Sequence, residues 1–232
     1  MNARSKLLAD RFGRRFAQLQ VGLVAYGVSM ALMIESRLGL DPWDVFHQGV
    51  AEVTGLRFGV VVILTGVAVL LAWIPLRQRP GLGTVSNVVV IGLAVDAAVA
   101  LLPTPDHLAV RAAFLVGGVL LNGLATGMYI GARLGPGPRD GLMTGYVALH
   151  PGRSIRLVRT AIEVSVLAVG WLLGGTVGVG TVVYALAIGP LAHRLIPLFT
   201  IPPRVPADAA RPVEPALART STAEPRPGAA SA

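Results

Sequence analysis

The stretch RLGLDPWD at residues 37–44 returns without gaps as RLGPGPRD at residues 133–140, so both copies share the pattern R-L-G-x-x-P-x-D. Each copy is followed five residues later by a glycine, Gly49 in the first and Gly145 in the second. The offset is constant, because 133 − 37 and 145 − 49 both equal 96. The chain therefore holds two copies of one unit, and this repeat governs how the rest of the sequence is interpreted.

A second motif, G-x-G-T, also occurs twice, at residues 81–84 and 178–181, and an isoleucine-glycine pair follows each copy. Its offset is 97, because 178 − 81 and 188 − 91 agree. We expect the glycines to allow tight turns with positive φ or close helix packing, and the threonines to be helix N-caps. Direct ligand contact is the alternative role. The residues concerned are Gly81, Gly83, Thr84, Gly178, Gly180 and Thr181.

The composition indicates an integral membrane protein. Of the 232 residues, 53% are hydrophobic and 14% are charged, whereas soluble domains carry about 25% charged residues. The net charge of +8 comes mainly from arginines between apolar runs, which favours membrane orientation over nucleic-acid binding. There is no cysteine, which excludes disulfides and thiol chemistry.

Six apolar stretches approach the length of about 20 residues that a membrane-spanning helix needs. They cover residues 16–34, 58–76, 84–102, 112–130, 157–174 and 179–198. We therefore predict an all-α membrane protein with six transmembrane helices. Arginine-rich segments alternate along the chain with arginine-poor loops, so the positive-inside rule places both termini in the cytoplasm.

The spans divide the chain into two halves of three. We expect a basic N-terminus (1–15), a first membrane repeat (16–102), a second (110–199) and a disordered Pro/Ala-rich tail (201–232). An odd number of spans per repeat forces the second copy to enter the membrane from the opposite side. The chain is then an inverted-topology repeat, with residues 37–44 at the outer face and residues 133–140 at the inner face.

The repeated motif also predicts a helix start. Asp41 at the N-cap, Pro42 at the first helical position and Asp44 at the third favour a helix from Pro42 to about Val53, ending at Gly55. Such a helix is about 18 Å long, which is too short to span a membrane.

The second copy predicts a similar helix from Pro138 to about Leu149. Each short helix lies flat on the membrane surface or enters it as a half-helix that lines a pathway, and the sequence leaves both options open. Arg37 and Arg133 hold an anion or pair with the motif aspartates, Asp44 and Asp140. Pairing is favoured, because both members recur together.

Two ionisable residues are expected near the middle of the membrane. Asp96 and His193 each lie twelve residues past the threonine of a G-x-G-T motif, and they are equivalent, since 193 − 96 = 97. Charges inside a bilayer raise a functional hypothesis. Asp96 has no partner nearby in the sequence, so it is a candidate proton or cation carrier. His193 is a candidate pH-sensitive partner, although extension toward the interface is favoured for it.

Glu163 is a third candidate carrier, but an i,i+4 pair with Arg159 is favoured for it. The four histidines are scattered without metal-ligand spacing, and no pair of acids is arranged for acid–base catalysis. We therefore expect no metal, no cofactor and no enzymatic activity.

The motifs resemble those of the YczE/YyaS/YitT family of bacterial integral membrane proteins. The resemblance rests on residues 39–44, on 81–84 with 91–92 and Asp96, and on 178–181 with 187–190, and it extends from about Gln18 to Phe199. It implies a multi-pass protein of the bacterial inner membrane. The resemblance is to the YczE branch more than to the YitT branch, whose extra soluble C-terminal domain we do not expect here.

We expect a small secondary transporter of an unknown solute or ion, with proton coupling as one option. The alternative is a non-transporting scaffold or regulatory partner that acts by lateral association in the bilayer, including association with its own copies.

Overall fold

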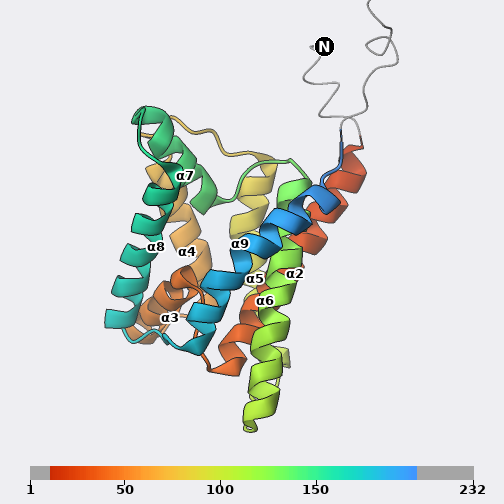
Figure 1. The fold of residues 1–232 in the computed structure, drawn as a ribbon, viewed down its shortest axis with the longest axis vertical. Helices are drawn as coiled ribbons and strands as arrows, with labels where there is room; N and C mark the ends of the chain where they lie inside the picture. Colours follow the sequence, from red (N-terminus) through yellow and green to blue (C-terminus); the bar gives the residue numbers. More distant parts are fainter. Residues whose placement is uncertain (1–10, 203–232) are drawn as a thin grey trace, which may run out of the picture. The chain divides into compact units, whose positions relative to one another are not determined.

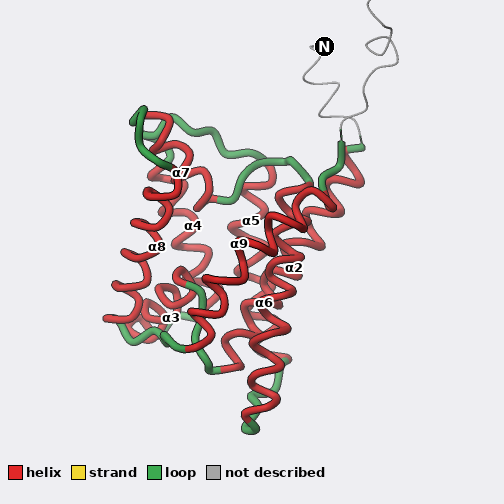
Figure 2. The backbone as a smooth tube through the Cα atoms, viewed as in Figure 1, coloured by secondary structure: helices red, strands yellow, loops and turns green. Residues whose placement is uncertain are grey.

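Eight α-helices make up the fold of residues 11–202, the part of the chain that the computed structural model describes (Figures 1 and 2). They are α2 (Phe12–Ser36), α3 (Pro42–Thr54), α4 (Phe58–Ala72), α5 (Leu82–Leu101), α6 (Leu108–Gly131), α7 (Pro138–Leu149), α8 (Ile155–Leu172) and α9 (Val179–Phe199). Within these residues there is no strand, which confirms the all-α class. The expected tail from residue 203 onward and residues 1–10 of the basic N-terminus lie outside this range.

Four helices, α2, α5, α6 and α9, are long and apolar enough to cross a membrane. A fifth crossing is formed if α3 and α4, which meet at a bend of 113°, count as one broken span. The expected number of six is not confirmed. With 15 residues, α4 is about 22 Å long, below the ~30 Å of the hydrocarbon layer, and α8 carries three charges, Arg156, Arg159 and Glu163.

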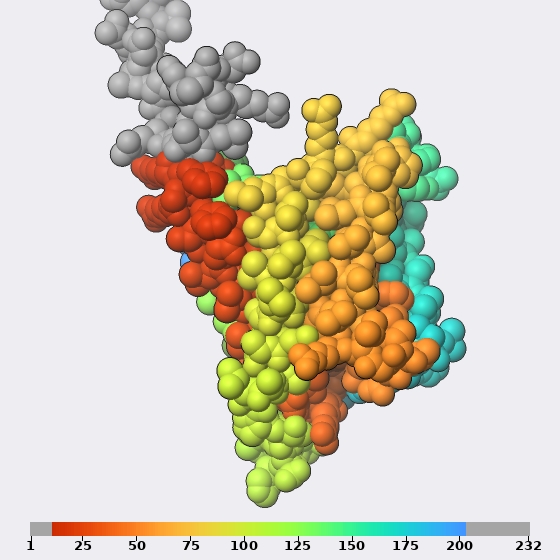
Figure 3. All heavy atoms as spheres, turned by 180° about the vertical axis from the view of Figure 1, so that it is seen from behind, coloured from red at the N-terminus to blue at the C-terminus, as the bar shows by residue number. Residues whose placement is uncertain are grey.

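Apolar side chains on the outside of these helices are consistent with contact to lipid. The face in Figure 3 is formed largely by α4 and α5, in orange and yellow. Leu64 and Leu71 of α4 are 53% and 60% exposed, and Leu93 of α5 is 60% exposed. A surface with many large exposed apolar side chains is typical of one that faces a bilayer or a partner protein rather than water.

Helices α2 and α6 pack antiparallel at the centre, with α5 against α2 and α9 against α6. Arg15, near the start of α2, donates hydrogen bonds to the carbonyls of Ala132 (2.8 Å) and Arg133 (2.6 Å) after α6. Arg111, near the start of α6, donates to the carbonyls of Ser36 and Arg37 after α2, both at 2.8 Å. Each arginine thus satisfies the free carbonyls at the end of the other helix, and 111 − 15 equals the repeat offset of 96.

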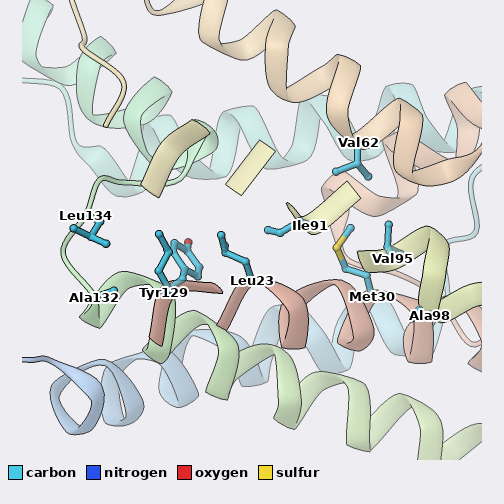
Figure 4. Packing of buried hydrophobic residues seen from close by; sticks show 11 residues of the cluster. Leu23, Met30, Val62, Ile91, Val95, Ala98, Tyr129, Ala132 and Leu134 are labelled. Carbon is cyan, nitrogen blue, oxygen red and sulfur yellow. The ribbon is translucent and has the colours of Figure 1, made fainter. Parts of the chain in front are cut away.

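A buried cluster fills the space between α2, α5 and α6 (Figure 4). Met30 of α2 lies beside Val95 of α5, and Leu23 of α2 lies toward Ile91 of α5; Leu23, Met30 and Val95 are fully buried. Tyr129 of α6 closes the cluster beside the cavity described below. This packing holds the two halves of the chain together.

The two motifs of each repeat are joined crosswise. The N–H of Gly180 donates to the carbonyl of Leu38 at 2.7 Å, and the N–H of Gly83 donates to the carbonyl of Leu134 at 2.9 Å. The first copy of R-L-G-x-x-P-x-D therefore contacts the second copy of G-x-G-T. The second copy of R-L-G-x-x-P-x-D likewise contacts the first copy of G-x-G-T. These turns need Gly39 and Gly135, whose φ values are 113° and 138°.

The G-x-G-T residues act only in part as expected. Gly81 and Gly178 are themselves the N-caps and have negative φ, so they do not form the expected turns with positive φ. Close packing, the other expected role, is the one that Gly81 has, because a Cβ there would lie 2.7 Å from the carbonyl oxygen of Leu134. The threonines stand at the third helical position. The hydroxyl of Thr84 accepts from the N–H of Gly81 (3.1 Å) and donates to the carbonyl of Pro136 (2.8 Å), and Thr181 accepts from Gly178 in the same way.

The short helices α3 and α7 form as the motif predicts. Asp41 Oδ1 accepts from the N–H groups of Trp43 (3.0 Å) and Asp44 (3.2 Å), and α3 ends at Gly55 with φ 71°. Helix α7 starts at Pro138 after Gly137. Figure 1 shows α3 and α7 at opposite ends of α8.

The motif glycines let each short helix pack closely on its neighbour. A Cβ on Gly49 of α3 would lie 2.8 Å from Cβ of Leu173 after α8, and one on Gly145 of α7 would lie 2.7 Å from Cγ of Gln78 after α4. Each short helix thus packs against the third helix of the other half, α3 on α8 and α7 on α4.

Candidate functional site

The first turns of α3 and α7 meet through Arg139. Its guanidinium nitrogens lie 3.8 Å from Oδ1 of Asp41 and 3.8 Å from Oδ1 of Asp44. Its carbon Cζ lies 4.9 Å from the ring centroid of Trp43, a cation–π geometry. Because Arg139 starts in α7 and reaches the first turn of α3, the N-terminal ends of the two short helices face each other.

The acids on the α3 side are deeply buried. Asp41 is 1% exposed and Asp44 is fully buried. Asp44 Oδ1 lies 3.1 Å from Nδ1 of His47, which is also buried. Within the described residues, Oδ2 of both aspartates and Nε1 of Trp43 have no hydrogen-bond partner. Buried polar atoms are normally paired, so this cluster has hydrogen-bonding capacity that the protein itself leaves unused.

The α7 side presents a third acid. Asp140 is the repeat equivalent of Asp44, and its Oδ2 accepts a hydrogen bond of 3.2 Å from the hydroxyl of Tyr129. The ring of Tyr129 meets that of Tyr26 edge to face, with 6.1 Å between centroids. Helices α2 and α6 thus bring two tyrosines to the place where the short helices meet.

A cavity of about 410 Å³ opens at this meeting point. Asp41, Trp43, Arg139 and Asp140 line it. Further polar side chains also line it: Tyr26, His47, Thr65, Asn87, Thr126, Tyr129, Arg159, Glu163 and Tyr184. Apolar side chains complete the wall, among them Val69, Val88, Ile130, Ile188 and Ile196. Such a volume with a few convergent polar groups is typical of a small-molecule site.

Arg37 and Arg133 do not line this cavity, and their expected pairing with Asp44 and Asp140 is wrong for the described part of the chain. Both arginines are exposed and end the helices α2 and α6 in left-handed turns, with φ 51° and 55°. The buried first turn of α3 instead receives its cation from Arg139.

Asp96 has no partner nearby in the sequence, as expected, but it has one on another helix. Its Oδ1 accepts a hydrogen bond of 2.6 Å from the N–H of Gly59, in the first turn of α4. A carboxylate at a helix N-terminus satisfies free N–H groups and the helix dipole, which explains an acid at this depth. Neither Asp96 nor the exposed His193 is among the residues that line the cavity.

The expected pair of Glu163 with Arg159 is confirmed, with Nε and Oε1 2.8 Å apart, and both residues line the cavity.

Asn122 makes interhelical hydrogen bonds: it donates to Ser29 Oγ (2.9 Å) and accepts from the hydroxyl of Tyr184 (3.1 Å).

Arg139 is the site residue that the motif analysis missed. It stands at a variable position of the repeat, where the first copy has Trp43. The available signal was the asymmetry itself, because a charged residue replaces an aromatic one inside an otherwise matching motif.

Sequence comparisons place the chain among membrane proteins. A family described as "Family of unknown function (DUF6198)" matches residues 13–197. An uncharacterized protein of Haemophilus influenzae is 39% identical over 188 residues, 81% of this chain and 86% of that protein. No solved structure is significantly similar.

Two relatives come from Bacillus subtilis. The uncharacterized membrane protein YczE is 33% identical over 179 residues, 76% of this chain and 82% of its own length. The uncharacterized protein YyaS is 25% identical over 182 residues, 77% of this chain and 90% of its own length. Both names confirm the resemblance found in the motifs. The chain therefore belongs to the DUF6198 family and is a YczE-like membrane protein.

Proposed function

We propose that this protein is a small secondary transporter of the bacterial inner membrane, without enzymatic activity, and that its substrate occupies the cavity between α3 and α7. The observation that carries the proposal is the pair of short helices whose first turns face each other across Arg139. In secondary transporters, the N-termini of broken helices lie near the middle of the membrane and point at anionic groups of the site, and at α3 this anionic group is the carboxylate of Asp41.

The proposal includes an inverted repeat of two halves, in which α2–α5 correspond to α6–α9. Support comes from the antiparallel packing of α2 and α6 and from the crosswise motif contacts. The equivalent arginines Arg15 and Arg111, which cap opposite ends of the α2–α6 pair, also support it. In such a fold, alternating access follows when one half moves against the other around a fixed site.

The short helices enter the membrane in this proposal. With 13 and 12 residues, α3 and α7 are too short to span it. The first turn of α3 is mostly buried, and that of α7 is buried or partly buried. Non-spanning backbone at depth is tolerated where it lines a cavity. The basic N-terminus and Arg133 are then cytoplasmic, as the positive-inside rule requires.

The test is flux in proteoliposomes that hold the purified full chain and an internal pH dye, challenged with sets of small amines, carboxylates and sugars. A transporter gives solute-dependent flux that Asp140→Asn abolishes, while Asp106→Asn, at an exposed acid outside the cavity, leaves it unchanged. If no solute moves and cross-linking in cells finds one reproducible membrane partner, the scaffold alternative replaces the transporter.

A further inference from the structure

The site holds more negative than positive charge. Asp41 and Asp44 contact one guanidinium, that of Arg139, and Asp140 lines the same cavity, while Arg159 is already paired with Glu163. His47, whose Nδ1 lies 3.1 Å from Oδ1 of Asp44, is counted as a neutral imidazole. The two facing helix N-termini contribute roughly half a positive charge each. About one negative charge is left over, and a buried charge must be paired or neutralised by a proton.

Unused acceptor atoms lie at the same place. Oδ2 of Asp41 and Oδ2 of Asp44 have no hydrogen-bond partner in residues 11–202, and Asp41 lines the cavity. The contacts of Arg139 with these aspartates are 3.8 Å long, compared with about 2.7–2.9 Å for a charge-assisted hydrogen bond. The acids are therefore not saturated by Arg139 and can accept hydrogen bonds from another donor.

Aromatic rings form the rest of the polar wall. Trp43 already carries a cation over its ring, at 4.9 Å, and Tyr26, Tyr129 and Tyr184 line the same cavity. Aromatic faces attract ammonium groups, and the valines and isoleucines of the wall suit an apolar substituent. Among the described residues, no group of three His, Cys, Asp or Glu side chains is placed to hold a metal ion.

We infer that the cavity binds a monovalent organic cation, a protonated amine with an apolar substituent, in exchange for a proton. This inference rests on the proposed transport function for its physiological meaning. The ammonium N–H groups donate to Asp41 and Asp140, and the substituent lies against the aromatic and apolar wall. Without the amine, a proton held by Asp41 neutralises the excess charge. When the amine binds, the O–H bond of the Asp41 carboxyl breaks and its proton is taken up by water, so one positive charge replaces another and no bond between heavy atoms changes.

Three probes of one size and different charge test the inference on the purified full chain: benzylammonium, benzyl alcohol and benzoate. Isothermal titration calorimetry in buffers of different ionisation enthalpy reports affinity and proton release together. Benzylammonium is expected to bind with release of a proton, and the other two probes to bind at least about tenfold more weakly. Asp41→Asn keeps a residue that caps α3 but should abolish proton release, and Asp140→Asn should weaken binding. Asp106→Asn is the matched control.

Preferential binding of benzoate would overturn the inference, because Arg139 and the helix ends would then define an anion site. Equal binding of all three probes, or no binding of benzylammonium, would also overturn it. The transport proposal is judged separately. If benzylammonium binds but no solute moves in proteoliposomes, the cation-site inference holds and the transport proposal fails. If a carboxylate moves and benzylammonium does not bind, the transport proposal holds and the cation-site inference fails.

Discussion

Arg139 and Trp43 occupy the same position in the two copies of the repeated motif, since 139 − 43 = 96, and the guanidinium of one lies 4.9 Å from the ring centroid of the other. Equivalent positions therefore meet where the two short helices face each other. The repeat explains why the first turns of α3 and α7 meet. The difference between tryptophan and arginine at the equivalent position allows a cation–π contact between them.

Removing the cation at this meeting should destabilise the protein. Arg139→Gln leaves buried Asp41 and Asp44 without their partner, and breaking a buried pair costs about 3–5 kcal/mol. We expect a lower midpoint in a thermal melt of the detergent-purified protein. Asp44→Asn in the Arg139→Gln background should restore part of the loss, because it removes one uncompensated charge. Simple addition of the two losses would contradict the pairing.

The contact between Arg139 and Trp43 should be measurable as a coupling. A double-mutant cycle with Trp43→Leu and Arg139→Met is expected to give a coupling free energy of about 0.5–2 kcal/mol. The matched cycle of Trp171→Leu with Arg139→Met should give none, because Trp171 is exposed on α8 and lies outside the cavity. A coupling near zero in the first cycle would show that the two side chains do not interact in solution.

Asp96 should matter for stability and not for transport. Asp96→Ala removes the cap of α4 and is expected to cost about 1 kcal/mol, whereas Asp96→Asn, which retains an acceptor, should cost less. Solute flux per molecule of reconstituted protein should be unchanged in both variants. A selective loss of flux in a stable Asp96→Asn protein would return this residue to the pathway.

The glycines of the crosswise contacts should not tolerate a methyl group. Gly83→Ala places a Cβ about 3.0 Å from the carbonyl carbon of Leu134, and Gly180→Ala places one 2.9 Å from Cδ1 of Leu115 and against the backbone of Gly39. Both changes should lower the melting temperature. Gly189→Ala in the same helix as Gly180 meets nothing within 4 Å, so it should be neutral or stabilising by up to about 1 kcal/mol. Equal effects at Gly180 and Gly189 would contradict the close contact.

Much of the fold follows from local chemistry. The cap at Asp41, the proline after it and the stop at Gly55 predict α3 almost to the residue, because helix ends depend on neighbours in the chain. The number of membrane crossings is harder to predict, because α4 is short and α8 is charged, and neither alone is among the helices long and apolar enough to span. The sequence predicts Thr84 as an N-cap, whereas it stands three positions later, at the third helical position. Its hydroxyl contacts the carbonyl of Pro136, which comes from the other half of the chain and cannot be identified from neighbouring residues.

The candidate site was predicted less well, for a similar reason. Asp96 looked unpartnered because its partner is a backbone N–H of another helix, which side-chain spacing does not reveal. Arg37 looked like the partner of Asp44 because both recur, yet recurrence is equally explained by a helix end and a helix start. Arg139 does not recur, so a search for shared residues passes over it.

Labelling of single introduced cysteines shows whether the two equivalent halves are inserted into the membrane in opposite directions. The chain has no cysteine, and Arg37 and Arg133 are exposed equivalents at the ends of α2 and α6. Arg37→Cys and Arg133→Cys are each treated with a membrane-impermeant maleimide in intact cells and in inside-out vesicles. We expect Arg37→Cys to be labelled from outside and Arg133→Cys from the cytoplasmic side; labelling of both from the same side would show that the two halves are not inverted.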